Sequence, residues 1–89
     1  MAATLSSDVL QDDLAVSLAH VVAAANQRAR ELGVDVPQSL ITITQDPGDD
    51  SWVWRVNYGP KEYVGRRGGD LLISVDPRDA SITQVLWGQ

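Results

Sequence analysis

The spacing of the apolar residues changes about a third of the way along the chain, and this change decides what the chain can fold into. From Leu10 to Leu32, apolar side chains recur every three or four residues, which predicts one stripe along an amphipathic helix. Beyond Pro37 the apolar residues alternate with polar ones, and many are β-branched or aromatic, as is typical of strands. We therefore expect one helix followed by a sheet.

The helix is predicted over residues 8–32. Ser6, Ser7 and Asp8 are candidate N-caps, and Gly33 is a natural residue just beyond a helix end. At 1.5 Å per residue such a helix would be about 37 Å long, whereas a six-residue strand spans about 20 Å. The helix must therefore cross the sheet diagonally, overhang it or bend. An overhanging apolar end would suit contact with a second subunit.

Four segments are predicted as strands joined by short turns. A helix followed by strands with short connections predicts an α+β fold of one domain, residues 1–89. In this fold one long N-terminal helix packs across a four-stranded antiparallel meander sheet. The strands are expected at residues 40–45, 52–58, 70–76 and 82–87.

One face of such a sheet is left without a covering layer. The predicted helix is rich in alanine and the strands carry the tryptophans, so small side chains are expected to pack against large ones on the helix side. The inward face of the last strand is ambiguous, because both of its alternating sets contain apolar residues. The open face is a candidate partner surface if it holds Val53, Leu72 and either Leu86 or Val85.

The composition excludes several kinds of site. The chain has no cysteine and one histidine, His20, so we expect neither a thiolate nor a multi-histidine metal site, and no cofactor. The net charge of −5 argues against nucleic-acid binding. The longest apolar run has five residues and the N-terminus lacks the pattern of a secretory signal. We therefore expect a cytoplasmic protein with no membrane partner.

No arrangement typical of an enzyme is present in the sequence. His20 lies in the predicted helix without an elbow motif of the G-x-S-x-G type, so it is expected at the helix surface. The acidic turn with Asp46, Asp49 and Asp50 lacks the spacing of a calcium loop. The acids lie in turns and at the helix start, which is typical of caps and solubilising charges. We predict a protein that is not an enzyme.

The most informative segment for binding is basic. Residues 55–67 carry four bases and one acid within a chain of net charge −5. Arginine pairs bidentately with carboxylates and phosphates, so this segment could hold an anion, dock an acidic partner or remain solvated. Trp87, near the C-terminus, is a candidate exposed aromatic. The candidate partner-binding residues are Arg55, Lys61, Arg66, Arg67 and Trp87.

The C-terminal half also resembles known families. The segment Trp52-Val-Trp-Arg-Val56, residues 67–76 and residues 80–89 are together similar to bacterial immunity proteins with a nuclear-transport-factor-like fold. The same stretch is similar to PepSY-type domains, whose last hairpin often reads Val-Asp-x-x-x-Gly-x-Ile. Ala80 stands here in the neighbourhood of that glycine, and the ending Trp87-Gly88-Gln89 departs from the His-Gly-Lys of the immunity proteins. The resemblance implies a cystatin-like module that binds or inhibits.

Three functions are therefore predicted. The first is a non-enzymatic protein-binding module, immunity- or inhibitor-like, that neutralises or regulates a protein partner. The second is a small-ligand or anion-binding domain that uses the loop with Arg66 and Arg67. The third is a structural subunit that forms a homodimer.

Overall fold

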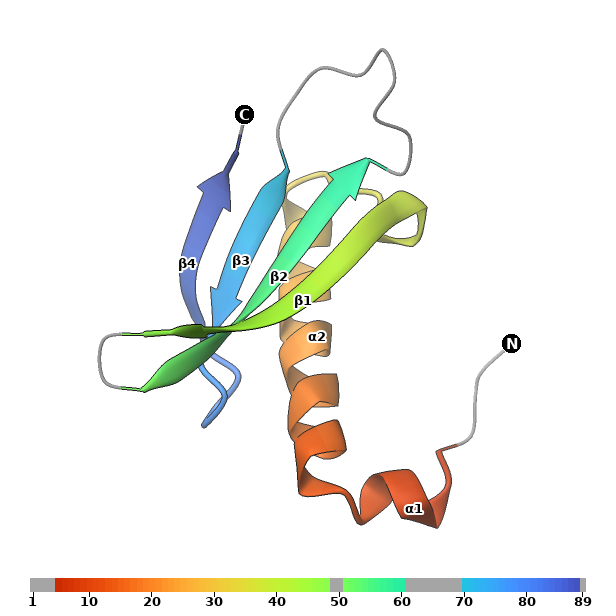
Figure 1. Cartoon of the computed structure of the whole chain (residues 1–89). Helices are drawn as coiled ribbons and strands as arrows, with labels where there is room; N and C mark the ends of the chain where they lie inside the picture. Colours follow the sequence, from red (N-terminus) through yellow and green to blue (C-terminus); the bar gives the residue numbers. More distant parts are fainter. Residues whose placement is uncertain (1–4, 49–50, 61–69, 89) are drawn as a thin grey trace.

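The computed structural model describes residues 5–48, 51–60 and 70–88. The sheet is an antiparallel meander in the order β1-β2-β3-β4, and one helix crosses one of its faces (Figure 1). The predicted α+β fold is confirmed. The elements are α1 (Ser7–Leu10), α2 (Asp13–Glu31), the 3-10 helix η1 (Val36–Gln38), β1 (Ser39–Pro47), β2 (Trp52–Pro60), β3 (Leu71–Val75) and β4 (Ile82–Trp87).

The prediction of one unbroken helix over residues 8–32 is wrong, because the chain turns before α2. Asp12 has extended backbone angles, and its carboxylate accepts a hydrogen bond of 3.0 Å from the backbone N–H of Ala15. Aspartate satisfies the free N–H groups of a helix start better than it continues a helix. It therefore starts a second helix, and α1 points away from the axis of α2 (Figure 1).

The predicted end of the helix is confirmed. Gly33 has a φ of 90°, in the left-handed region that glycine adopts without steric cost. Its N–H bonds the carbonyl of Arg30 at 3.0 Å, and the N–H of Val34 bonds the carbonyl of Ala29 at 3.0 Å. These two bonds form the Schellman motif, which satisfies the last carbonyls of α2 and turns the chain toward the sheet.

The first two strands are longer than predicted. β1 and β2 pair without interruption over nine residues each, from Ser39 opposite Pro60 to Pro47 opposite Trp52. The predicted turn residues Asp46 and Pro47 therefore belong to the ladder. β3 is one residue shorter at each end than predicted, and β4 has the predicted bounds.

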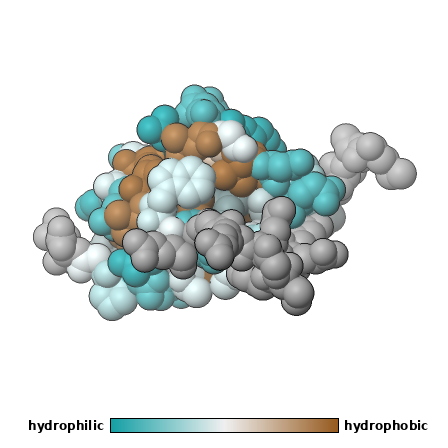
Figure 2. Space-filling model, turned by 90° about the horizontal axis from the view of Figure 1, so that it is seen from above, coloured by the Kyte–Doolittle hydropathy of each residue, from teal (hydrophilic) through white to brown (hydrophobic). Residues whose placement is uncertain are grey.

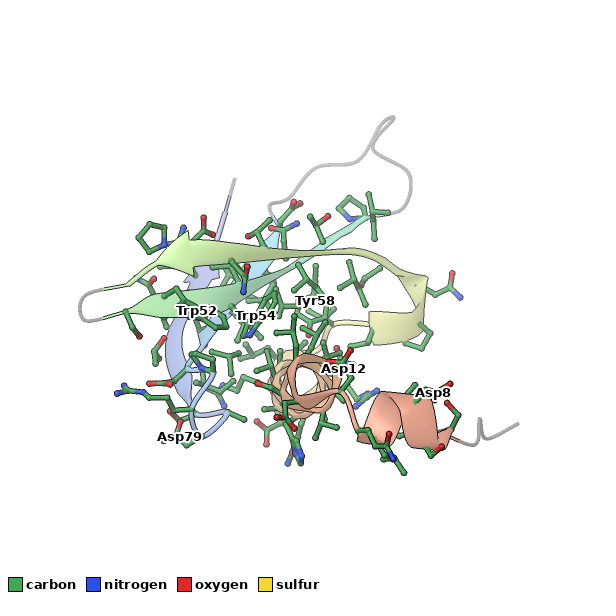
Figure 3. All side chains as sticks on the ribbon, turned by 60° about the horizontal axis from the view of Figure 1, so that its bottom comes forward. Asp8, Asp12, Trp52, Trp54, Tyr58 and Asp79 are labelled. Carbon is green, nitrogen blue, oxygen red and sulfur yellow. The ribbon has the colours of Figure 1, made fainter. Side chains whose placement is uncertain are left out.

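The core lies between α2 and the inner face of the sheet. Small side chains of α2 meet large side chains of β2 and β3, and Trp52, Trp54 and Tyr58 follow one another along this side of β2 (Figure 3). The Tyr58 hydroxyl donates a 2.7 Å hydrogen bond to Asn26 of α2, and burial raises the pKa of Tyr58 to about 12. The buried apolar residues are Val21, Ala25, Ala29, Val36, Trp54, Val56, Tyr58, Leu71, Ile73 and Val75.

The helical layer is longer than the part of the sheet that it covers. Leu14 lies on the same stripe of α2 as Val21 and Ala25, yet it is 57% exposed while they are fully buried. Figure 1 shows that the first turns of α2 continue past the edge strand β1. The helix therefore overhangs the sheet, one of the outcomes that its length predicts.

We expect the substitution Ile73→Ala to lower the free energy of unfolding by about 2–5 kcal/mol, because the fully buried side chain would leave a cavity beneath α2. Leu10→Ala is the control, since Leu10 is 59% exposed and its truncation should change that free energy by about 0.5 kcal/mol or less. Urea denaturation followed by circular dichroism measures both. Equal losses for the two variants would contradict this description of the core.

Candidate protein-binding surface

The strand pairing assigns every strand residue to one of two faces. Val56 and Ile73 are buried beneath α2, and Val85 pairs with Ile73 and shares their face. Leu86 therefore points to the other side, which resolves the ambiguity of the last strand. We call this other side the outer face; its residues are Leu40, Thr42, Thr44, Asp46, Val53, Arg55, Asn57, Leu72, Ser74, Gln84 and Leu86.

Arg55 lies in the middle of the outer face and forms an ion pair. Its Nε lies 3.6 Å from Oδ2 of Asp46, and the same carboxylate oxygen accepts a 3.0 Å hydrogen bond from the hydroxyl of Thr44. At 3.6 Å the contact is electrostatic and too long for an N–H···O hydrogen bond. This buried Nε has no hydrogen-bond partner among the described residues. The pair is about one-third exposed, so a binding partner could reach it.

A polar pocket of about 500 Å³ lies at the end of the outer face, beside the turn that joins β3 to β4. It is lined by both Arg55 and Arg78. Arg78 pairs with Asp76, with 2.8 Å between Nη2 and Oδ2 and 3.1 Å between Nε and Oδ1. Because each arginine already faces a carboxylate, the pocket is close to electrically neutral.

The turn after β3 is held by its own acidic side chains. The side-chain and backbone hydrogen bonds from Arg78 lower the pKa of Asp76 to about 2. The pKa of Asp79 is lowered as well, because its carboxylate accepts hydrogen bonds from Ser81. Ala80 has a φ of 58°, a left-handed conformation that favours glycine. This backbone angle explains why a glycine would suit the position.

The structure separates the predicted binding residues. Arg55 is on the outer face, whereas Trp87 pairs with Leu71 and points to the helix side, where it is 57% exposed at the edge of the sheet. Apolar side chains gather on the surface seen from above, the end of the molecule at which β2 and β4 finish (Figure 2). The other predicted residues, Lys61, Arg66 and Arg67, lie outside the described residues.

Two residues of this surface, Asp46 and Arg78, are not among the predicted binding residues. Asp46 is predicted in a turn, although its carboxylate is the partner of Arg55. The strand register supplies the missing information for Asp46, and it also selects Leu86 over Val85 for the outer face. Arg78 lies in the turn after β3, and only the folded turn brings it to the pocket.

His20 is exposed on α2, as expected of a helix-surface histidine. It borders a shallow hollow between α2 and the turn after β3, together with Leu10 and Pro77. Over residues 5–48, 51–60 and 70–88, no three histidine, aspartate or glutamate side chains come together to hold a metal ion. Within the same ranges, neither helix combines the length and apolar character needed to cross a membrane.

The chain matches no protein-family model, and no curated protein or solved structure is significantly similar to it.

Replacing Ala80 with glycine should stabilise the protein by about 0.5–1 kcal/mol, because glycine adopts a positive φ without the clash of a β-carbon. Ala23→Gly is the matched control at an exposed position of α2, where glycine should cost about 1 kcal/mol. Urea denaturation of both variants tests the turn geometry. A loss of stability in Ala80→Gly would show that the left-handed conformation is not adopted.

The Asp76 carboxylate should make stability depend on acidic pH. Its pKa is about 2 in the folded protein and 3.8 without the fold, so its stabilising effect is present above 3.8 and is lost as the pH falls toward 2. Thermal melts between pH 5 and pH 2 should therefore fall less steeply for Asp76→Asn than for the unchanged protein. Asp35→Asn, an exposed aspartate outside this turn, should keep the steep fall; identical curves for all three proteins would contradict the assignment.

Proposed function

We propose that the chain is a non-enzymatic protein-binding module, immunity- or inhibitor-like, that neutralises or regulates a protein partner through its outer face. The observation that carries this proposal is that α2 covers one face of the sheet only. On the other face Leu40 is 47% exposed and Leu86 is 46% exposed, although both lie in regular strands.

The outer face has the mixed character of a protein interface. Each of the four strands contributes one apolar side chain to this face, and the ion pair between Arg55 and Asp46 lies among its polar residues. Such interfaces combine apolar contact area with polar groups, and arginine is enriched among the residues that contribute most to affinity. The apolar members of the face are Leu40, Val53, Leu72 and Leu86.

The charge of the surface favours a partner with an acidic group. The guanidinium of Arg55 is held near one carboxylate at 3.6 Å, and a second carboxylate from a partner could form the shorter, bidentate contact that arginine prefers. Lys61, Arg66 and Arg67 follow β2 in the sequence and would add to this attraction. An apolar patch with an acidic rim is therefore the partner surface that fits best.

The sequence resemblance points in the same direction. The cystatin-like modules that the chain resembles mostly bind or inhibit other proteins. The helix and the meander sheet have the order that such a module requires. Ala80 adds support, because it occupies the neighbourhood of the glycine in the PepSY-type hairpin and has a backbone angle that suits glycine.

A second candidate function, binding of a small anion, is favoured by the pocket that holds Arg55 and Arg78. An anion there would have to compete with the carboxylates of Asp46 and Asp76. Titration with inorganic phosphate, followed by NMR at the arginine side chains, distinguishes the two functions. Saturable shifts at both arginines would favour the anion site over the protein interface.

The protein-binding function predicts loss of a specific partner when the outer face is charged. The full chain and its variants Leu86→Asp and Arg55→Glu would be immobilised and exposed to lysate of the source cells, and captured proteins identified by mass spectrometry. The expected partner binds the unchanged chain and the control Gln27→Glu, which alters an exposed residue of α2. It should be lost from Leu86→Asp and Arg55→Glu, because each places a new negative charge in the interface.

Calorimetry with the purified partner then measures how much each variant raises the dissociation constant. Leu86→Asp should raise the dissociation constant at least about tenfold, since burial of one leucine contributes about 1.5–3 kcal/mol. Circular dichroism establishes that each variant is folded. If no captured protein distinguishes these variants from the control, the outer face is not the binding surface.

A further inference from the structure

The exposed edge of β1 is poorly protected against pairing with another molecule, except at its C-terminal end, where Asp46 and Pro47 lie. Residues 40–45 contain no charged residue, no proline and no glycine, and all nine residues of β1 pair with β2 in continuous register. Natural edge strands are usually protected by charges, prolines, bulges or short length. The opposite edge, β4, is shorter, and its pairing with β3 shifts register near Ser74 and Val75.

The same edge is the one that α2 overhangs. The sheet-facing stripe of α2 is fully buried at Val21 and Ala25, half-buried at Leu18 and 57% exposed at Leu14. In Figure 1 the N-terminal turns of α2 extend past β1, and α1 lies on the same side of α2 as the start of β1. Beneath these turns, further strands beyond β1 would supply the missing part of the sheet.

We propose that β1 pairs antiparallel with β1 of a second copy of this chain, so that each copy's sheet covers the overhanging helix of the other. The two-fold axis would pass near Ile43, the middle residue of β1. It would stand perpendicular to the sheet, which places both α2 helices on one face of a continuous sheet of eight strands, twice the four in each chain. Leu14 of each copy would then lie over the other copy's β1, where Ile41 is 37% exposed on the helix side.

The length of the overhang matches the place of β1 in a second copy. Leu18 still packs against the core, and Leu14 lies four residues further along α2, about 6 Å at 1.5 Å per residue. One added strand widens a sheet by about 4.8 Å, so the first strand of a second copy would lie beneath Leu14.

The charges of the helices agree with this arrangement. Antiparallel pairing places the N-terminal end of one α2 beside the C-terminal end of the other. The first end carries Asp12 and Asp13, preceded by Asp8 in α1, and the second carries Arg28 and Arg30 beside one acid, Glu31, which pairs with Arg28 at 3.3 Å. Unlike charges would therefore face each other across the two-fold axis. The outer face stays free in this dimer, so the proposed partner-binding surface and the self-association are independent.

The mass of the full chain in solution tests the proposal. Light scattering coupled to size exclusion should give twice 9.6 kDa for the unchanged protein. Leu14→Glu should raise the dissociation constant of the dimer about 100-fold or more, because a charge would replace the leucine that the dimer buries. Thr42→Lys, on the exposed edge of β1, should also give a monomer, since it places two lysines close to the axis.

Two controls keep the result specific. Gln84→Lys makes the same kind of charge change on the outer face of β4, and Gln27→Glu makes one on the exposed side of α2; both should stay dimeric. Circular dichroism and thermal melts establish that Leu14→Glu and Thr42→Lys are folded. A monomer for the unchanged protein at concentrations up to about 1 mM overturns the proposal, as does a dimer that survives both Leu14→Glu and Thr42→Lys.

Hydrogen exchange tests the strand pairing itself. Within one chain β1 is an edge strand, so only alternate amides of β1 can bond to β2 and the others face outward. In the dimer the outward amides should also be protected, and Leu14→Glu should make them exchange at least about tenfold faster while the inward set stays protected. Unprotected outward amides in a dimer of the unchanged protein would show that the copies meet elsewhere and overturn the β1 pairing.

Discussion

The packing of small side chains of α2 against large side chains of β2 and β3 is the contact on which the rest of the structure depends. Ala25 and Ala29 are fully buried, and their small size lets the helix approach the sheet closely. Trp54 and Tyr58 fill the space that the alanines leave, and the hydrogen bond from Tyr58 to Asn26 fixes the two layers relative to each other. The outer face of the sheet and the first turns of α2 lie outside this contact.

The core leaves apolar surface outside it in two places, each for a physical reason. The outer face is open because one helix can cover only one side of a sheet, which exposes Leu40 and Leu86. The overhang of α2 is open because a helix of 19 residues is longer than the sheet is wide beneath it. We assign the first surface to a protein partner and the second to another copy of the chain.

Local sequence patterns predicted the helix and the strands well. They did not predict where the helix breaks or which residues of different strands lie side by side. The stripe of α2, the left-handed Gly33 and the bounds of β4 were all predicted, because each depends on residues close in the sequence. The break at Asp12 was not, since an aspartate in a helical pattern can be either a surface residue or a cap. The ion pair of Arg55 with Asp46 was also missed, because it joins two strands whose register the pattern does not contain.

By itself, the sequence determined the α+β class, the order of a helix and four strands, and the exclusion of thiolate and multi-histidine chemistry. These follow from periodicity and composition, which act along the chain. Only the tertiary structure decided that Leu86 faces outward, that Trp87 lies on the face opposite to Arg55, and that Leu14 extends beyond the sheet. These depend on strand register and on the angle between layers, which are set by packing between segments distant in the sequence.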